Sequence, residues 1–197
     1  MVLKGKSVTP EQANKLILKR AKWILDKLEL VRSIKDEDIV TGSRIPYLGR
    51  RYYTEIFFNE DLKKTTIEFT HSKFKITVNS KENIQPLIRE SLGKFYKKKA
   101  IEKITLRLKK WSADTGLKYN ELKFRQMGKR WGSCTETNNI HINIEAIKLP
   151  YTLIDYLLVH ELVHTVEKNH SKRFWAELAK HMQKWKELDE ELYGVRV

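Results

Sequence analysis

The chain has 197 residues, of which 41% are hydrophobic and 32% charged, the composition of a folded globular protein with one sizeable core. No apolar run approaches the roughly 18 residues that cross a bilayer, and the single cysteine, Cys134, excludes an internal disulfide. The formal net charge of +14 favours polyanionic partners or acidic substrates, although a lysine-rich solvated surface would give the same count.

The first 80 residues are predicted to form a helix and a small β unit. Thr9 and Pro10 form a helix-start pattern, and apolar residues then recur at a helical period to about Val31. The polar segment 33–43 is expected to be a loop. Stretches rich in aromatic and β-branched residues follow, and they predict an antiparallel unit of about three strands, at 47–58, 65–69 and 74–78.

A long helical pattern dominates the middle of the chain. It runs from Asn83 to Trp111, has lysines along one flank, and has its expected stop at Gly116. Residues 122–127 and 140–144 are predicted strands separated by a strong turn signal, and Ile140, Ile142 and Ile144 alternate along one face of the second strand.

The last part of the chain is predicted to be helical. Pro150 opens a helix with a buried leucine-rich stripe, and Ser171 has the position of an N-cap for a final helix that continues to about Leu192. The most informative stretch, His160-Glu-Leu-Val-His164, lies in the first of these helices.

The spacing of this stretch predicts a metal site. Residues four apart share a helix face, so the imidazoles of His160 and His164 can point at one ion while Glu161 projects beside it. His170 follows ten residues after His160, the offset of H-E-x-x-H-x-x-G-x-x-H proteases. Three neutral imidazoles leave a fourth tetrahedral position for water, as in catalytic zinc sites. We therefore predict Zn²⁺ on the three histidines, with Glu161 as the general base that takes a proton from the zinc-activated water.

Two details of the site stay open. Glu167 stands where the protease pattern has glycine, so the turn must be made differently, for example through Asn169 in left-handed geometry. Glu177, on the next helix, is the alternative to His170 as third ligand.

Residues upstream of the motif are candidates for substrate binding. Arg130 could hold a substrate carboxylate or phosphate or form a structural ion pair, and Trp131 could line a pocket or belong to the core. His141 could bind substrate or stabilise an oxyanion, or it could face solvent from its strand. Cys134 is interpreted as a small buried thiol. The strand 140–144 is a candidate edge for pairing with an extended peptide.

The motif lies among short blocks that together resemble one known family. The blocks are Tyr47-Leu-Gly-Arg-Arg-Tyr52, the helix 94–111, Arg130-Trp-Gly-Ser-Cys134, the strand 140–144, Ile154 to His164, and Asn169-His-Ser-Lys-Arg-Phe-Trp175. They are similar to the YgjP-like metallopeptidase family, which is zincin-like and related to the WLM and SprT-type groups. The resemblance implies zinc on His160, His164 and His170, with Glu161 as the catalytic base. Because that family usually has strands before the first helix, we expect a reduced N-terminal sheet here.

These observations predict an α+β, zincin-like zinc metallopeptidase. Residues 1–80 would form the N-terminal helix and β unit and residues 81–197 the catalytic region, together one compact domain. We expect a monomeric, cytoplasmic protein that acts on a peptide or protein, because residues 1–7 contain no signal core. The alternatives are a metal-dependent nucleotide phosphoanhydride hydrolase and a nucleic-acid-associated protein, either a protease of DNA-bound proteins or a binding module. Against the latter, the chain has no zinc-ribbon cysteines and no helix-turn-helix signature.

Overall fold

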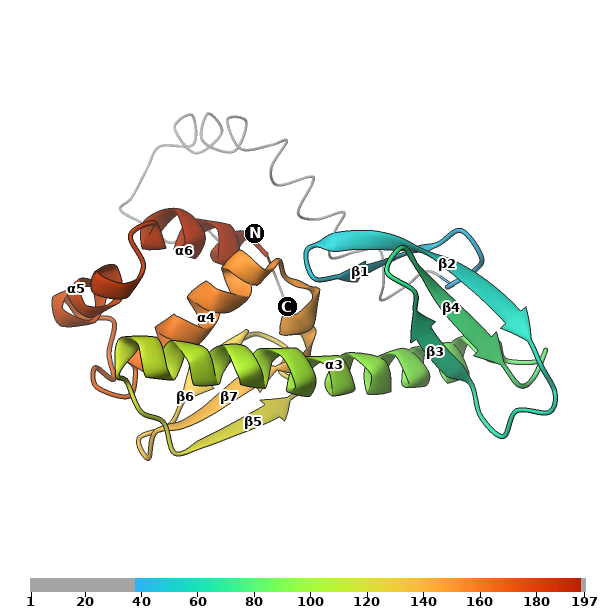
Figure 1. The fold of residues 1–197 in the computed structure, drawn as a ribbon, viewed down its shortest axis with the longest axis horizontal. Helices are drawn as coiled ribbons and strands as arrows, with labels where there is room; N and C mark the ends of the chain where they lie inside the picture. The colour runs from blue at the N-terminus through green and yellow to red at the C-terminus, as the bar shows by residue number, and fades with distance from the viewer. Residues whose placement is uncertain (1–37, 196–197) are drawn as a thin grey trace, which may run out of the picture.

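The computed structural model describes residues 38–195, so the helix predicted for residues 9–31 lies outside the described part. A long helix, α3 (Ile84–Thr115), crosses the molecule and connects two small sheets. Figure 1 shows one sheet at the N-terminal end of α3, with the other sheet and three further helices along its C-terminal half. This arrangement confirms the mixed α+β class. None of the described helices is both long and apolar enough to cross a bilayer.

The first sheet has a mixed topology that the prediction missed. Its strands are β1 (Arg44–Tyr47), β2 (Arg50–Phe58), β3 (Thr66–Phe69) and β4 (Lys73–Val78), in the order β1-β2-β4-β3. A turn at Leu48 and Gly49, both with positive φ, lies inside the first predicted stretch (47–58) and separates β2 from β1, which begins before that stretch at Arg44. Because β2 pairs with β4 in parallel, the expectation of a purely antiparallel unit of about three strands is wrong.

Helix α3 confirms the long helix predicted from its apolar period. Its buried residues recur at helical spacing, and they are Ile88, Leu92, Phe95, Tyr96, Ala100, Ile104 and Leu108. Gly116 ends the helix in left-handed geometry, with φ of 75°. The helix extends one turn beyond the predicted Trp111, where the Thr115 hydroxyl donates a hydrogen bond to the Trp111 carbonyl.

The second sheet places a short strand beside the motif helix. Its strands are β5 (Glu121–Arg125), β6 (Gly132–Cys134) and β7 (Asn139–Asn143), in the order β5-β7-β6. The two strands predicted in this region are confirmed, whereas no strand was predicted at β6. Since β7 pairs on both sides, the interpretation of residues 140–144 as an edge for a peptide is wrong, and the edge strand nearest the motif is β6.

The C-terminal region contains a 3₁₀ segment and three helices. They are η1 (Ile144–Lys148), α4 (Tyr151–Val163), α5 (Lys172–His181) and α6 (Trp185–Gly194). Ser171 caps α5 by accepting hydrogen bonds from the backbone N–H groups of Arg173 and Phe174, as predicted. The single helix expected from Ser171 to Leu192 is wrong, because Met182 leaves helical geometry at φ −133° and ψ 92°.

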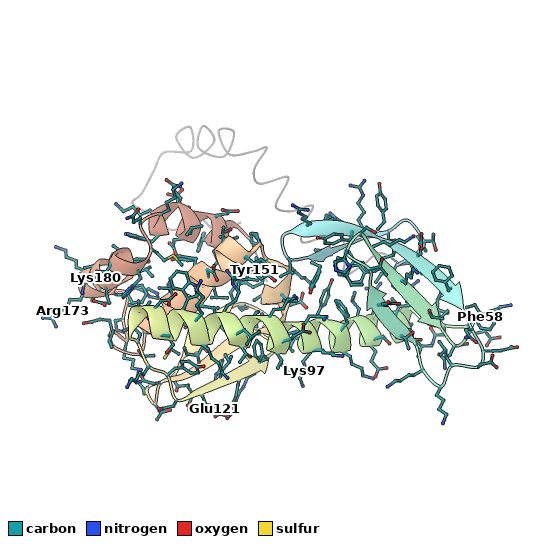
Figure 2. The ribbon with its side chains drawn as sticks, viewed as in Figure 1. Phe58, Lys97, Glu121, Tyr151, Arg173 and Lys180 are labelled. Atoms are coloured by element: carbon teal, nitrogen blue, oxygen red, sulfur yellow. The ribbon has the colours of Figure 1, made fainter. Side chains whose placement is uncertain are left out.

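A charged pair fixes α4 against α3. Arg107 of α3 donates two hydrogen bonds to Asp155 of α4, one of them 2.6 Å long from Nε to Oδ1. The Arg107 guanidinium also lies 4.3 Å from the ring centre of Tyr151, which Figure 2 shows at the start of α4. A bidentate pair of this kind specifies orientation as well as contact, so it sets how α4 lies on the long helix.

Candidate metal centre

Helix α4 and the loop that follows it bring three imidazoles together. His160 and His164 lie four residues apart on α4, and His170 lies just before α5. One ring nitrogen from each residue lies within 4.8 Å of the other two, and the Nε2 atoms of His160 and His170 are 2.9 Å apart. Among residues 38–195 this is the only group of three or more histidine, cysteine or carboxylate side chains with that geometry.

The loop between α4 and α5 turns back without the glycine of the protease pattern. Backbone hydrogen bonds extend the end of α4, with the Glu167 N–H donating to the Val163 carbonyl. The Lys168 ammonium donates to the Thr135 carbonyl and to Asn138 Oδ1, which fastens the loop to the turn before β7. Asn169 is not among the described residues with positive φ, so the expected left-handed turn at that residue is wrong.

Aromatic rings hold the histidines in place. The fully buried ring of Phe174 lies 4.9, 4.5 and 4.6 Å from the rings of His160, His164 and His170. Trp175 stacks on His170 with centroids 5.5 Å apart. Burial, with smaller effects of the other two imidazoles, lowers the pKa of His160 to about 3, and burial also lowers the pKa of His164. These two imidazoles are therefore neutral at pH 7, the state that a metal ligand requires.

The two helical histidines have partners for their other ring nitrogen. Nδ1 of His164 lies 3.0 Å from the carbonyl oxygen of Glu167, which can only accept a hydrogen bond. Nδ1 of His160 lies 3.3 Å from the hydroxyl of Tyr156, which in turn donates to Asp189 of α6. Sequence reasoning missed Tyr156 and Asp189. The spacing of Tyr156, one helical turn before His160, was the available signal for the first of them.

Glu161 lies beside the cluster with one oxygen unsatisfied. Its side chain is buried, and its Oε2 atom has no hydrogen-bond partner within the described residues. Burial raises the pKa of Glu161 to about 8, and the charge of Arg130 opposes this shift. A Cβ atom on Gly132 of β6 would lie 2.6 Å from Oε1, so the carboxyl group lies directly against the backbone of the edge strand. An unpartnered buried oxygen is costly, so this atom is available to pair with a group outside the protein.

The raised pKa of Glu161 predicts how the stability of the metal-free protein depends on pH. Between its unfolded value of 4.5 and about 8, the folded chain binds a proton at this residue that the unfolded chain does not. We therefore expect the free energy of unfolding to fall as pH rises from about 7.5 to 8, where the histidines of the unfolded chain, with a pKa of about 6.5, are already mostly neutral. Urea unfolding in a chelating buffer measures this, and the same slope in Glu161→Gln would contradict the assignment.

The three candidate substrate-binding residues lie outside the histidine cluster. Trp131 donates from its indole nitrogen to the Val195 carbonyl at 2.8 Å, and Arg130 is exposed at the entrance to β6. His141 pairs with Ser133 across the strands, on the face opposite that of Gly132, Ile140 and Ile142. It therefore lies on the side of the sheet that faces away from Glu161, and the structure does not bring it to the cluster.

Glu177, the alternative third ligand, pairs with other side chains of its own helix. Glu177 on α5 pairs with Lys180 and lies 3.4 Å from Nε2 of His181. These partners lower the pKa of Glu177, with the hydrogen bond from Lys180 as the largest cause. Figure 2 shows Arg173 and Lys180 of the same helix extending outward from the molecule. Of the two candidates, only His170 belongs to the convergent group.

One comparison with known proteins identifies a family for this chain. The family model "YgjP-like, metallopeptidase domain" matches residues 2–194. No curated protein matches the chain. Among solved structures, the metallopeptidase zymogen abylysin of Pyrococcus abyssi is 20% identical, with a TM-score of 0.41 over 45% of this chain and 90% of that chain. The metallopeptidase zymogen jannalysin of Methanocaldococcus jannaschii is 18% identical, with a TM-score of 0.41 over 46% of this chain and 93% of that chain.

Proposed function

The chain belongs to the YgjP-like metallopeptidase family, and from this premise we propose that it hydrolyses peptide bonds with a zinc ion held by His160, His164 and His170. The observation that carries the proposal is the convergence of three imidazole nitrogens beside a buried carboxyl group that has no partner for Oε2 within the described residues. In this reading Glu161 is the general base and not a ligand.

The donor set fits zinc. The group contains imidazole nitrogens and neither thiolate nor carboxylate ligands, and catalytic zinc sites commonly combine three protein ligands with one open position. His170 is exposed, which leaves that open side accessible to solvent and substrate. When bound, zinc supplies Lewis-acid chemistry, lowering the pKa of water and polarising a substrate carbonyl.

Glu161 would move the protons. A general base works best when its pKa lies near the working pH, and burial, opposed by the charge of Arg130, raises the pKa of Glu161 to about 8. A cation held by the neighbouring histidines favours the ionised carboxylate, so Oε2 can accept a proton from water. The same oxygen would then return the proton to the leaving amine as the peptide bond breaks.

We propose that an extended substrate pairs with strand β6. It is an edge strand, and no described strand pairs with its other side. Gly132 lets the backbone of β6 approach the Glu161 carboxyl group, so a peptide that pairs with β6 would run past the base. The main-chain hydrogen bonds would supply affinity that depends little on substrate sequence.

Metal analysis combined with two hydrolysis assays tests the function. We expect one zinc ion per purified full-length chain, cleavage of an unfolded protein, loss of cleavage on chelation and recovery with added zinc. Release of phosphate from nucleotides without peptide cleavage would instead support the phosphohydrolase alternative. A nucleic-acid partner stays a prediction from the charge of +14, and DNA binding that weakens steeply with salt would test it.

Gly132 provides a test of the position of the base. In Gly132→Ala the added methyl group would meet Oε1 of Glu161 at 2.6 Å, and the buried carboxyl group must shift. Because a misplacement of about 1 Å can cost roughly 100-fold in rate, we expect peptide hydrolysis to fall by about that factor while zinc binding persists. Turnover and zinc content are measured on the same preparation.

Gly128→Ala is the matched control. A Cβ atom at Gly128 meets nothing within 4 Å, and this residue lies in the loop that leads to β6. We expect unchanged activity in this variant. Equal activity in both variants would show that β6 does not constrain the carboxyl group.

A further inference from the structure

We propose that Tyr156 and Asp189 are positioning residues that fix the tautomer and orientation of His160, so that helix α6 controls how tightly the three-histidine cluster holds a metal ion. The inference rests on the proposed function, because it assumes that His160 is a ligand. It adds a role for the C-terminal helix, which contributes no residue to the cluster itself.

The direction of two hydrogen bonds determines the tautomer. The Tyr156 hydroxyl donates to Asp189 Oδ1 at 2.6 Å, and an ionised carboxylate can only accept. The single phenolic hydrogen is therefore committed to Asp189, and the phenolic oxygen has only lone pairs to offer Nδ1 of His160 at 3.3 Å. Nδ1 must then carry the hydrogen, which leaves the lone pair of Nε2 free.

The free nitrogen is the one that faces the cluster. Nε2 of His160 lies 2.9 Å from Nε2 of His170. The opposite tautomer would place a hydrogen on this nitrogen and leave two lone pairs facing each other between His160 and Tyr156. Because Tyr156 is fully buried, water cannot readily relieve that repulsion.

Helix α6 holds Asp189 at the required place. Figure 1 shows α6 beside α4, and the two helices are in contact. Trp185, at the first position of α6, stacks on Trp175 with ring centroids 4.6 Å apart and an interplanar angle of 20°. Trp175 itself stacks on His170, so the same helix supports a second member of the cluster.

His164 differs from His160 in this respect. Its Nδ1 atom is paired with the carbonyl of Glu167 in the adjoining loop, at 3.0 Å. Its tautomer is therefore set by local backbone and does not depend on α6. Replacement of Asp189 should thus change the tautomer of His160 and leave the tautomer of His164 unchanged.

Zinc affinity of the full chain, measured by competition with a chromophoric chelator, tests the proposal without any assay of turnover. Loss of a hydrogen bond to a ligating histidine typically costs about 10- to 100-fold in metal affinity, and we expect a loss in this range for Tyr156→Phe. Asp189→Ala should also weaken binding. The double variant should bind no more weakly than Tyr156→Phe, because Asp189 acts through the phenol.

Two matched variants control for general effects. Tyr193→Phe makes the same change at a side chain of α6 that is 81% exposed, and Glu191→Ala removes an exposed carboxylate from that helix. Both should bind zinc as the wild type does. Losses in Tyr156→Phe and Asp189→Ala no larger than in these controls, or additive losses in the double variant, would overturn the proposal.

The tautomer can also be observed directly. In ¹⁵N NMR spectra of the metal-free wild type, His160 should show a protonated Nδ1 and an unprotonated Nε2, and Tyr156→Phe should shift it towards the other tautomer. An unchanged tautomer in Tyr156→Phe would overturn the inference while leaving the proposed function intact. A wild type that binds zinc no better than His160→Ala would overturn both.

Discussion

Replacing Glu161 with glutamine is expected to abolish peptide hydrolysis while zinc stays bound. The amide has nearly the same volume as the carboxyl group, so it fits against Gly132, but it cannot accept a proton. General base catalysis typically contributes 100- to 10,000-fold, and we expect a loss of about 1,000-fold or more. Turnover of an unfolded protein and zinc content, measured on one preparation, check this result.

The variant also separates the base from the ligands. Glu161 is not part of the group of convergent nitrogens, so its replacement should leave zinc stoichiometry unchanged. The neighbouring Glu167→Gln serves as a control on the loop, since its side chain does not lie in that group. Wild-type turnover in Glu161→Gln would exclude the residue as base, and loss of zinc would identify it as a ligand.

Removing His170 is expected to weaken metal binding strongly. Structural zinc sites are worth about 10 to 16 kcal/mol, so deletion of one of three protein ligands should weaken binding on the order of 1,000-fold. Its Nε2 atom is the partner of His160 Nε2 at 2.9 Å, and no other described side chain completes the group. Zinc dissociation constants of His170→Ala and the wild type, measured at pH 7, give the comparison.

Glu177→Ala is the decisive counterpart. This change removes the partner of Lys180 and His181 but leaves the three imidazoles in place. Zinc affinity should therefore stay at the wild-type level. If Glu177→Ala loses zinc and His170→Ala keeps it, the carboxylate moves into the site in solution and the assigned ligand set is wrong.

Features that depend on residues close together in the sequence were predicted correctly. The spacing of His160 and His164 on one helix face, the cap at Ser171 and the stop at Gly116 depend on residues within a few positions of each other. Such features follow from helical geometry and capping chemistry, which act over one or two turns. For the same reason the apolar period of residues 83–111 predicts helix α3 without knowledge of the fold.

The predictions that were wrong concern features that depend on residues far apart in the sequence. The parallel pairing of β2 with β4 and the central place of β7 are set by tertiary packing, which strand composition does not encode. Strand β6 is three residues long and starts with Gly132, so nothing local distinguished it from a loop. The break at Met182 interrupts an apolar period that continues on both sides, and it places Asp189 where Tyr156 can reach it.

The turn at Gly49 links the first sheet to the start of the motif helix. A Cβ atom at Gly49 would lie 2.6 Å from Cβ of Pro150, the residue that precedes α4, and the Gly49 N–H donates to the Lys148 carbonyl. The buried hydroxyl of Tyr96 on α3 donates to the Pro46 carbonyl at 2.7 Å. A fragment that begins after residue 80 would lose the Gly49 contacts at the start of the helix that bears His160 and the Pro46 contact of α3. We therefore expect residues 81–195 to need the first sheet for a stable fold.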